Sequence, residues 1–167
     1  FTAQEAWPLI PEQTEKYVFT AEWYDIPVAS KANLLSEADW QTLIAVKSAV
    51  NKFIETARTA KIVGSNLSAK VELWADAELK DVLDRLDDEL RFVMITSQVL
   101  VNAFDATPGE ASHLAGLNVQ VSAADGEKCV RCWHVLPDVN THVTHPGLCG
   151  RCIINLPTGQ GEERKYA

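Results

Sequence analysis

The sequence predicts an α+β fold: a small helix-and-strand junction domain followed by a four-cysteine zinc-ribbon-like module, both preceded by the end of a helical domain. Three observations lead to this prediction. One long stretch repeats apolar residues at helical spacing, two short stretches alternate apolar and polar residues, and two C-x2-C pairs lie near the end of the chain. A hydrophobic content of 47% is enough for a globular core.

The first part of the chain, residues 1–27, combines aromatic residues with three prolines, which is typical of a helix end followed by an irregular, packed connector. The chain begins with Phe1, and no basic stretch leads into an apolar one, so we expect a piece of a longer protein without a signal peptide. No apolar run reaches about 18 residues, so we expect no membrane-spanning segment.

A long helix is predicted over residues 37–62. Ser36 is suited to cap its first turn, and the acidic Glu37 and Asp39 suit the positive end of the helix dipole. Gly64 stands where a helix commonly ends. The apolar stripe that defines the helix consists of Trp40, Leu43, Ile44, Val50, Phe53, Ile54 and Ala57.

Strands and a second helix follow. Residues 70–75 alternate as a half-buried strand does, and Asp76 is suited to cap a helix. The apolar, β-branched stretch 91–101 predicts a central strand, residues 106–116 a loop, and residues 117–123 one more alternating strand. The stripe of the second helix consists of Leu79, Val82, Leu83, Leu86 and Leu90.

The chain has four cysteines, in two C-x2-C pairs separated by sixteen residues: Cys129, Cys132, Cys149 and Cys152. In a tight turn, thiolates three positions apart point to the same side, so each pair supplies two ligands of a tetrahedral zinc site. Gly150 eases the second turn because glycine tolerates positive φ, and we expect the intervening loop to return as a β-hairpin. Four protein ligands leave no open position, so we predict one structural Zn²⁺ that holds the module folded.

Other interpretations of these residues stay open. The cysteines could form disulfides or a redox dithiol, although no feature indicates secretion and a redox motif normally occurs once. Arg131 and Arg151 each stand directly before the second cysteine of a C-x2-C motif, where they either balance the charge of the thiolates or contact phosphate. Trp133 either forms the small core of the module or offers its ring as a stacking platform for a base. We expect none of the nearby histidines to be a ligand: His134, His142 and His145.

Several motifs together resemble one family. They are "GEKCVRCWH…LCGRC", the terminal "RKYA", "ARTAKIVGSNLSAKVEL", "ELRFVMITSQV" and "FTAQEAW", and they cover essentially the whole chain in order. This combination closely resembles the C-terminal region of bacterial isoleucyl-tRNA synthetase. Val130 departs from the proline more often found in the motif, which leaves the zinc prediction unchanged.

The resemblance implies three segments: residues 1–27 as the end of a helical anticodon-stem-binding domain, 28–123 as the α+β junction domain, and 124–167 as the zinc module. It also implies a cytoplasmic enzyme that ligates isoleucine to its tRNA, with the ATP and Mg²⁺ sites in upstream domains of the same chain. The segment would grip the anticodon side of isoleucine tRNA and be inactive alone, because neither the HIGH-like nor the KMSKS-like motif of the catalytic domain occurs in it.

The charge distribution indicates where RNA would be contacted. Residues 1–126 contain 10 basic and 19 acidic side chains, whereas residues 127–167 contain 5 and 4. Because phosphate attraction dominates RNA affinity, we predict that the contacts lie in the second, non-acidic part. The predicted tRNA-binding residues are Lys128, Arg131, Trp133, Arg151, Arg164 and Lys165.

Two functions of other classes compete with this one. DNA glycosylases of the formamidopyrimidine type end in a similar four-cysteine finger, but they require an N-terminal proline nucleophile, and this chain begins with Phe1. The second alternative is a free-standing zinc adaptor that binds protein through the acidic face of its second helix. Protection of isoleucine tRNA by the full-length protein, tested against duplex DNA and unrelated tRNAs, separates tRNA binding from these two alternatives.

Overall fold

The computed structural model describes residues 1–23, 25, 35–104 and 108–166. Residues 1–34 form one compact unit and residues 35–167 a second. The predicted boundaries at 27/28 and 123/124 stay predictions, and the first of them lies outside the described residues. No helix among the described residues is long and apolar enough to cross a membrane.

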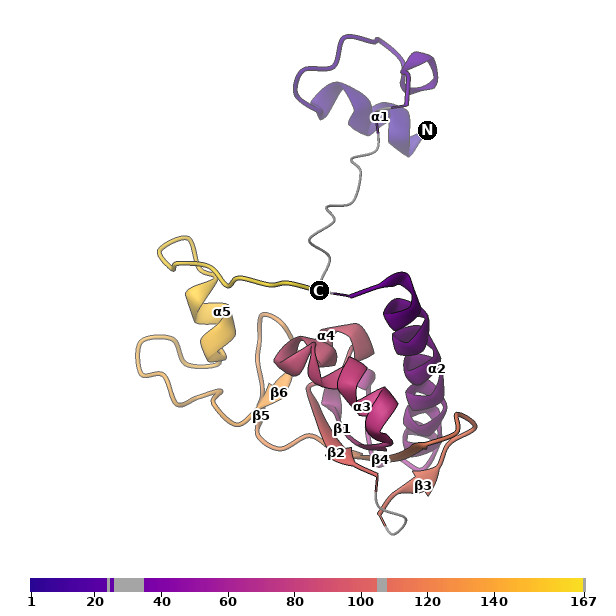
Figure 1. Ribbon diagram of the computed structural model, residues 1–167. Helices are drawn as coiled ribbons and strands as arrows, with labels where there is room; N and C mark the ends of the chain where they lie inside the picture. The colour runs from indigo at the N-terminus through magenta and orange to yellow at the C-terminus, as the bar shows by residue number, and fades with distance from the viewer. Residues whose placement is uncertain (24, 26–34, 105–107, 167) are drawn as a thin grey trace. The chain divides into compact units, whose positions relative to one another are not determined.

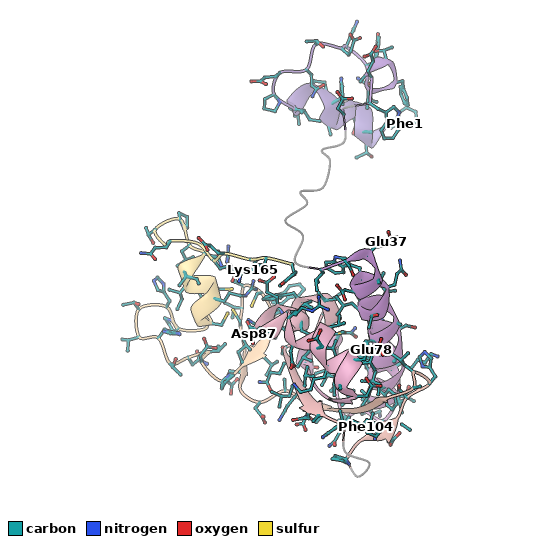
Figure 2. The ribbon with its side chains drawn as sticks, viewed as in Figure 1. Phe1, Glu37, Glu78, Asp87, Phe104 and Lys165 are labelled. Carbon is teal, nitrogen blue, oxygen red and sulfur yellow. The ribbon has the colours of Figure 1, made fainter. Side chains whose placement is uncertain are left out.

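The first unit contains little regular structure: the short helix α1 (Thr2–Ala6) and the 3₁₀ turns η1 (Trp7–Leu9) and η2 (Val18–Thr20). The short helix and the irregular chain after it agree with the prediction, but the connector was also expected to be packed, and within its own unit it is not. None of its residues 1–23 is buried. Phe1, Phe19 and Trp23 are all more than 80% exposed (Figure 2), so these aromatic rings have no core within their own unit.

The second unit is built on a four-stranded sheet in the order β2-β1-β4-β3 (Figure 1). Strand β1 (Ala69–Ala75) runs parallel to β2 (Gln98–Ala103) and antiparallel to β4 (Leu117–Ala123), and β3 (Glu110–Ala111) extends the far edge. Figure 1 shows the helices gathered over one face of this sheet. They are α2 (Glu37–Thr59), α3 (Ala77–Asp84) and α4 (Leu90–Met94), with the 3₁₀ turns η3 (Asn66–Ser68) and η4 (Asp87–Glu89) between them.

The core lies between the sheet and these helices. The predicted alternation of β1 is confirmed: Val71 and Leu73 are fully buried, whereas Lys70 and Glu72 face the other side and form an ion pair at 3.0 Å. The helices contribute the rest of the apolar cluster. Its most deeply buried helical side chains are Leu43, Val46, Val50, Ile54, Leu83, Leu90 and Met94.

The stretch 91–101 was expected to be a central strand, and that prediction is wrong in two respects. Residues up to Met94 belong to helix α4, and the strand that follows, β2, lies at the edge of the sheet. Leu90 and Met94 stand one helical turn apart and are both buried in the core, so tertiary packing overrides the β-branched composition. Ile95 then takes a left-handed conformation with φ 58° and turns the chain into the strand.

Helix α2 ends at Thr59, three residues before its predicted end at residue 62. Two residues later, Lys61 adopts a left-handed φ of 58°, which a helix cannot continue through. The start of α2 is the predicted one. The Ser36 hydroxyl accepts the Asp39 N–H at 3.1 Å, and the Asp39 carboxylate accepts the Ser36 N–H at 2.7 Å, which forms a capping box. The same carboxylate receives both terminal nitrogens of Arg85, at 2.8 and 3.1 Å, so the cap also ties α2 to the end of α3.

This arrangement predicts a pH dependence. The Ser36 N–H, the Arg85 guanidinium and the Ser36 hydroxyl hold the pKa of Asp39 at about 2, below its ordinary 3.8. A depressed carboxyl pKa adds stability above about pH 4 that is lost as the pH falls toward 2. We therefore expect Asp39→Asn to lower the melting temperature at pH 7, with a deficit that shrinks below pH 4. Glu37→Gln, in the same exposed first turn (Figure 2), removes the same charge but leaves the capping box and the Arg85 ion pair in place, so it should lower the melting temperature less at pH 7.

Candidate metal centre

The first cysteine pair sits in a tight hairpin. Strands β5 (Glu127–Lys128) and β6 (Val135–Leu136) pair antiparallel on either side of it. Within the turn, the Cys129 N–H donates to the His134 carbonyl and the Trp133 N–H to the Cys129 carbonyl, both at 2.9 Å. Trp133 takes φ 66° to close the turn. A hairpin was expected between the two pairs; it is found instead around the first pair.

The second pair opens a helix. Cys149 is the N-cap of α5 (Gly150–Ile154), and Cys152 follows in its first turn. The Gly150 N–H donates to the Asp138 carboxylate at 2.6 Å. Gly150 has a helical rather than a positive φ, so the predicted reason for glycine is wrong. The position needs a small residue because an added Cβ would lie 3.1 Å from the Asp138 carboxylate.

The four cysteine sulfurs converge on one point. All four lie within 4.8 Å of one another, and the Cys132 and Cys149 sulfurs are 3.7 Å apart. A tetrahedral zinc site with Zn–S bonds of about 2.3 Å requires sulfurs about 3.8 Å apart, whereas a disulfide requires about 2.05 Å. All four cysteines are free, so the disulfide interpretation fails and the donor set fits zinc. A four-cysteine zinc-binding site is present.

The electrostatics of the site call for a cation. Burial raises the pKa of Cys149 and of Cys152, because a thiolate is less stable than a thiol away from water. Burial also acts on Cys129, but the N–H groups of Cys132, Cys149 and Arg131 outweigh it and lower the Cys129 pKa to about 6. Such a cluster can ionise fully only around a positive centre, and a divalent metal ion supplies it.

The two arginines cross between the pairs. The Arg151 guanidinium interacts electrostatically with the sulfur of Cys132, and the Arg131 guanidinium with that of Cys152, so each arginine acts on the second cysteine of the opposite pair. Both positions suit compensation of thiolate charge. Arg131 is nevertheless exposed, and it donates a long hydrogen bond, at 3.5 Å, to the Asn155 carbonyl. Arg151 is mostly buried and pairs with Glu162 at 3.2 Å.

None of the three nearby histidines belongs to the cysteine cluster among the described residues. His134 is 7% exposed and sets its ring edge-on to Phe92, with centroids 5.9 Å apart. Burial, and then the charges of Arg151 and Arg91, lower the pKa of His134, so its ring is neutral. His142 lies 3.8 Å from the Asp138 carboxylate.

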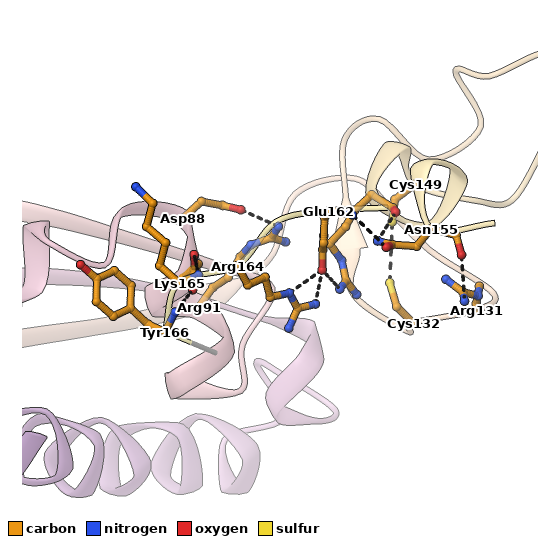
Figure 3. Close-up of polar contacts among 12 residues, drawn as sticks. Asp88, Arg91, Arg131, Cys132, Cys149, Asn155, Glu162, Arg164, Lys165 and Tyr166 are labelled. Atoms are coloured by element: carbon orange, nitrogen blue, oxygen red, sulfur yellow. Dashed lines mark hydrogen bonds and ion pairs between the residues drawn. The ribbon is translucent and has the colours of Figure 1, made fainter. Parts of the chain in front are cut away.

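The structure separates the six residues predicted to contact tRNA into two groups. Lys128, Arg131 and Trp133 are exposed at the first cysteine pair, and the Lys128 ammonium lies 5.2 Å above the Trp133 ring. Arg151 and Arg164 instead share the Glu162 carboxylate. Figure 3 shows Lys165 at the opposite end of the contacts from Arg131, and the Lys165 N–H donates to the Glu89 carboxylate.

Three side chains that the sequence analysis missed organise this second group: Phe92, Glu89 and Glu162. Guanidinium groups of Arg91, Arg151 and Arg164 lie 4.6, 5.0 and 4.1 Å from the centre of the Phe92 ring. The sequence gives no signal for Phe92, which belongs to the stretch predicted as a strand. The run "EERK" at 162–165, two acidic residues followed by two basic ones, is a hint of ion pairing that the sequence does carry.

Comparison with known proteins agrees with this geometry. Residues 126–154 match the family described as the zinc finger found in FPG and IleRS. The chain is 77% identical over 167 residues to the isoleucine–tRNA ligase of Acinetobacter baylyi, covering 100% of the chain and 18% of the relative. Over its whole length, the chain matches the C-terminal part of isoleucine–tRNA ligases.

More distant relatives carry the same name. The isoleucine–tRNA ligases of Pseudoalteromonas atlantica and Saccharophagus degradans are both 45% identical, over 170 and 167 residues. In each, the alignment covers 100% of this chain and 18% of the relative. The chain thus spans about a fifth of the length of these isoleucine–tRNA ligases, and the resemblance inferred from its motifs is confirmed.

Proposed function

We propose that this chain is the tRNA-binding C-terminal segment of an isoleucine–tRNA ligase, in which a structural Zn²⁺ presents an RNA-contacting surface to the anticodon side of isoleucine tRNA. One observation carries the proposal. Trp133 is 60% exposed, although it is the largest side chain of a module with very little core. A tryptophan placed at the surface by a metal-held turn supplies a flat face on which a base stacks.

The surroundings of Trp133 support this role. Lys128 above the ring and Arg131 in the same turn add positive charge beside the stacking face. These three residues form what we call the Trp133 surface. Its opposite side is anchored by Cys129 and Cys132, so the surface keeps its shape when RNA binds. Arg151 and Arg164 bind the Glu162 carboxylate and do not contact RNA in this proposal.

The rest of the isoleucine–tRNA ligase completes the function. We assign ATP and Mg²⁺ binding and the ligation of isoleucine to upstream domains of the same polypeptide, in the cytoplasm, where thiols stay reduced and available to zinc. The exposed aromatic rings of Phe1, Phe19 and Trp23 support an upstream partner within the chain, because apolar rings of this size normally pack against other residues.

The alternatives are less well supported. A formamidopyrimidine-type DNA glycosylase would share the finger but not the 167 residues of similarity to isoleucine–tRNA ligases. A free-standing zinc adaptor would use the acidic side of α3. There Asp84 pairs with Lys80 at 2.5 Å, which reduces the charge available to a partner.

The proposal is tested by footprinting with the full-length protein. We expect protection of anticodon-side nucleotides in isoleucine tRNA, and no comparable protection of unrelated tRNAs or duplex DNA. Chelation of zinc should remove that protection while acceptor-end contacts made by upstream domains remain. Protection confined to the acceptor end, or equal protection of duplex DNA, would contradict the proposal.

A further inference from the structure

The four-cysteine module (residues 127–155) and the α+β body (residues 35–123) have separate apolar cores. The module's cluster comprises Cys129, Val139, Cys149 and Cys152, with Cys132, Leu136 and Leu148 at its margin. Among the described residues, no apolar cluster contains side chains of both parts. A hollow of about 410 Å³, lined by Leu100 and Leu136 among others, lies between them. Polar contacts must therefore hold the module in its orientation.

One such contact lies beside the first cysteine pair. The Val135 N–H donates to the hydroxyl of Ser97 at 2.7 Å, and that hydroxyl donates to the Leu67 carbonyl at 2.5 Å. Ser97 is fully buried, so this hydrogen bond is shielded from water. A single point of attachment still allows the module to pivot, and further contacts are needed to fix its direction.

The Phe92 ring provides a second attachment. The ring contacts His134 and Arg151 of the module and Arg164 near the end of the chain, at the distances given above. Glu162 joins the two arginines: its carboxylate accepts from Arg151 at 3.2 Å and from Arg164 at closer range. Figure 3 shows Glu162 and Arg164 lying between α5 and α4. Charge-assisted bonds of this kind are the stronger class of protein hydrogen bond.

The last segment, residues 161–166, is hydrogen-bonded to the module at one end and to the α+β body at the other. On the module side, the Gly161 N–H donates to the Ile154 carbonyl at 2.8 Å, and the Glu162 N–H to the Asn155 side chain at 3.1 Å. On the body side, one carboxylate, that of Glu89, accepts the N–H groups of Lys165 and Tyr166 at 2.8 and 2.6 Å. The Tyr166 ring then packs against the core of the body.

From these contacts we infer that residues 161–166 are a strap that fixes the orientation of the four-cysteine module on the α+β body. The carboxylates of Glu162 and Glu89 are the two fastenings of the strap. The Phe92 ring is contacted both by the strap, through Arg164, and by the module, through Arg151. The strap thereby sets the direction in which the Trp133 surface faces. Only this last step rests on the proposed function; the fastening itself concerns residues of this chain alone.

The test compares Glu162→Gln with Glu163→Gln in the full-length, zinc-loaded protein. Glu163 is the adjacent, exposed acid, so the two variants lose the same charge at neighbouring positions. We expect Glu162→Gln to keep its zinc and to speed amide hydrogen exchange in residues 127–136 and 161–166 about tenfold, the loss expected for a charge-assisted bond. Glu163→Gln should exchange as the unchanged protein does. Glu89→Gln, at the other fastening, should repeat the effect of Glu162→Gln.

Aminoacylation kinetics supply a second readout. Both fastening variants should raise the KM for tRNA several-fold while isoleucine activation and kcat stay unchanged, because a loose module misplaces the Trp133 surface without touching the chemistry. Unchanged exchange in both variants would overturn the strap, as would loss of zinc from Glu162→Gln. If Trp133→Ala raises the KM for tRNA and the fastening variants do not, the strap does not set the orientation. If Trp133→Ala also has no effect, the proposed function fails and hydrogen exchange alone decides the strap.

Discussion

Replacing Cys149 by serine in the full-length protein is expected to abolish zinc binding and to unfold residues 127–155. The Cys149 thiol is fully buried at the centre of the module, where it contacts the sulfur of Cys132. The module's apolar cluster consists largely of the cysteines themselves. Zinc-finger peptides gain about 10–16 kcal/mol from structural zinc, which exceeds the stability of most entire domains. Loss of one ligand therefore removes most of what folds the module.

Elemental analysis and peptide-resolved hydrogen exchange measure this effect. The unchanged protein should contain one zinc per chain at the four-cysteine site, and Cys149→Ser none. Exchange should rise to the unfolded rate in residues 127–155 and stay slow in helix α2, which has its own core with the sheet. His142→Gln is the control, because His142 lies outside the cysteine cluster and its replacement should leave zinc bound. Cooperative loss of protection in α2 together with the module would show that the two parts fold as one.

The features that were predictable from the sequence are those with a local cause. Helix α2 begins at the predicted residue because Ser36 and Asp39 cap each other across a single turn. Strand β4 matches its predicted range, 117–123: Leu117 and Val119 enter the core as the alternation requires, although Asn118 between them is buried as well. The cysteine site was predictable because the spacing of two ligands within one turn fixes their direction, whatever the rest of the chain does.

The features that could not be predicted depend on distant contacts. The apolar, β-branched run after Leu90 is equally consistent with a strand or a buried helix, and only its packing against α2 and β2 decides for α4. The strap is a similar case. Phe92, Glu89 and Glu162 become partners only when the end of the chain returns more than 70 residues to α4, and no local pattern records that return.

Trp133 illustrates how structure resolves an ambiguity that composition leaves open. In a module of some thirty residues, a tryptophan is either core or contact surface, and sequence alone does not separate the two. The cysteines and Val139 make up the small buried core of the module, and the Trp133 ring lies outside it, 60% exposed. Removing the ring should therefore leave the fold largely intact and affect whatever binds to its face.

We accordingly expect Trp133→Ala in the full-length protein to retain zinc and to raise the KM for isoleucine tRNA by about 5- to 150-fold, as expected for a stacked base worth about 1–3 kcal/mol. ATP-dependent activation of isoleucine should be unchanged, because the proposal places that chemistry upstream. Val143→Ala is the matched control: Val143 is an apolar side chain of the same module, is 96% exposed and does not belong to the Trp133 surface, so its loss should alter neither readout.

Arg131→Ala separates two contributions within the same surface. Its guanidinium opposes the rise that burial causes in the pKa of Cys152, and it is also exposed two positions before Trp133 in the sequence. If it contacts phosphate, the variant keeps its zinc and the KM for tRNA rises, with a smaller dependence on salt than in the unchanged protein. If it only balances thiolate charge, zinc affinity falls and zinc-loaded samples charge tRNA normally. Loss of zinc from Trp133→Ala would return that residue to the core and remove the stacking face from the proposed function.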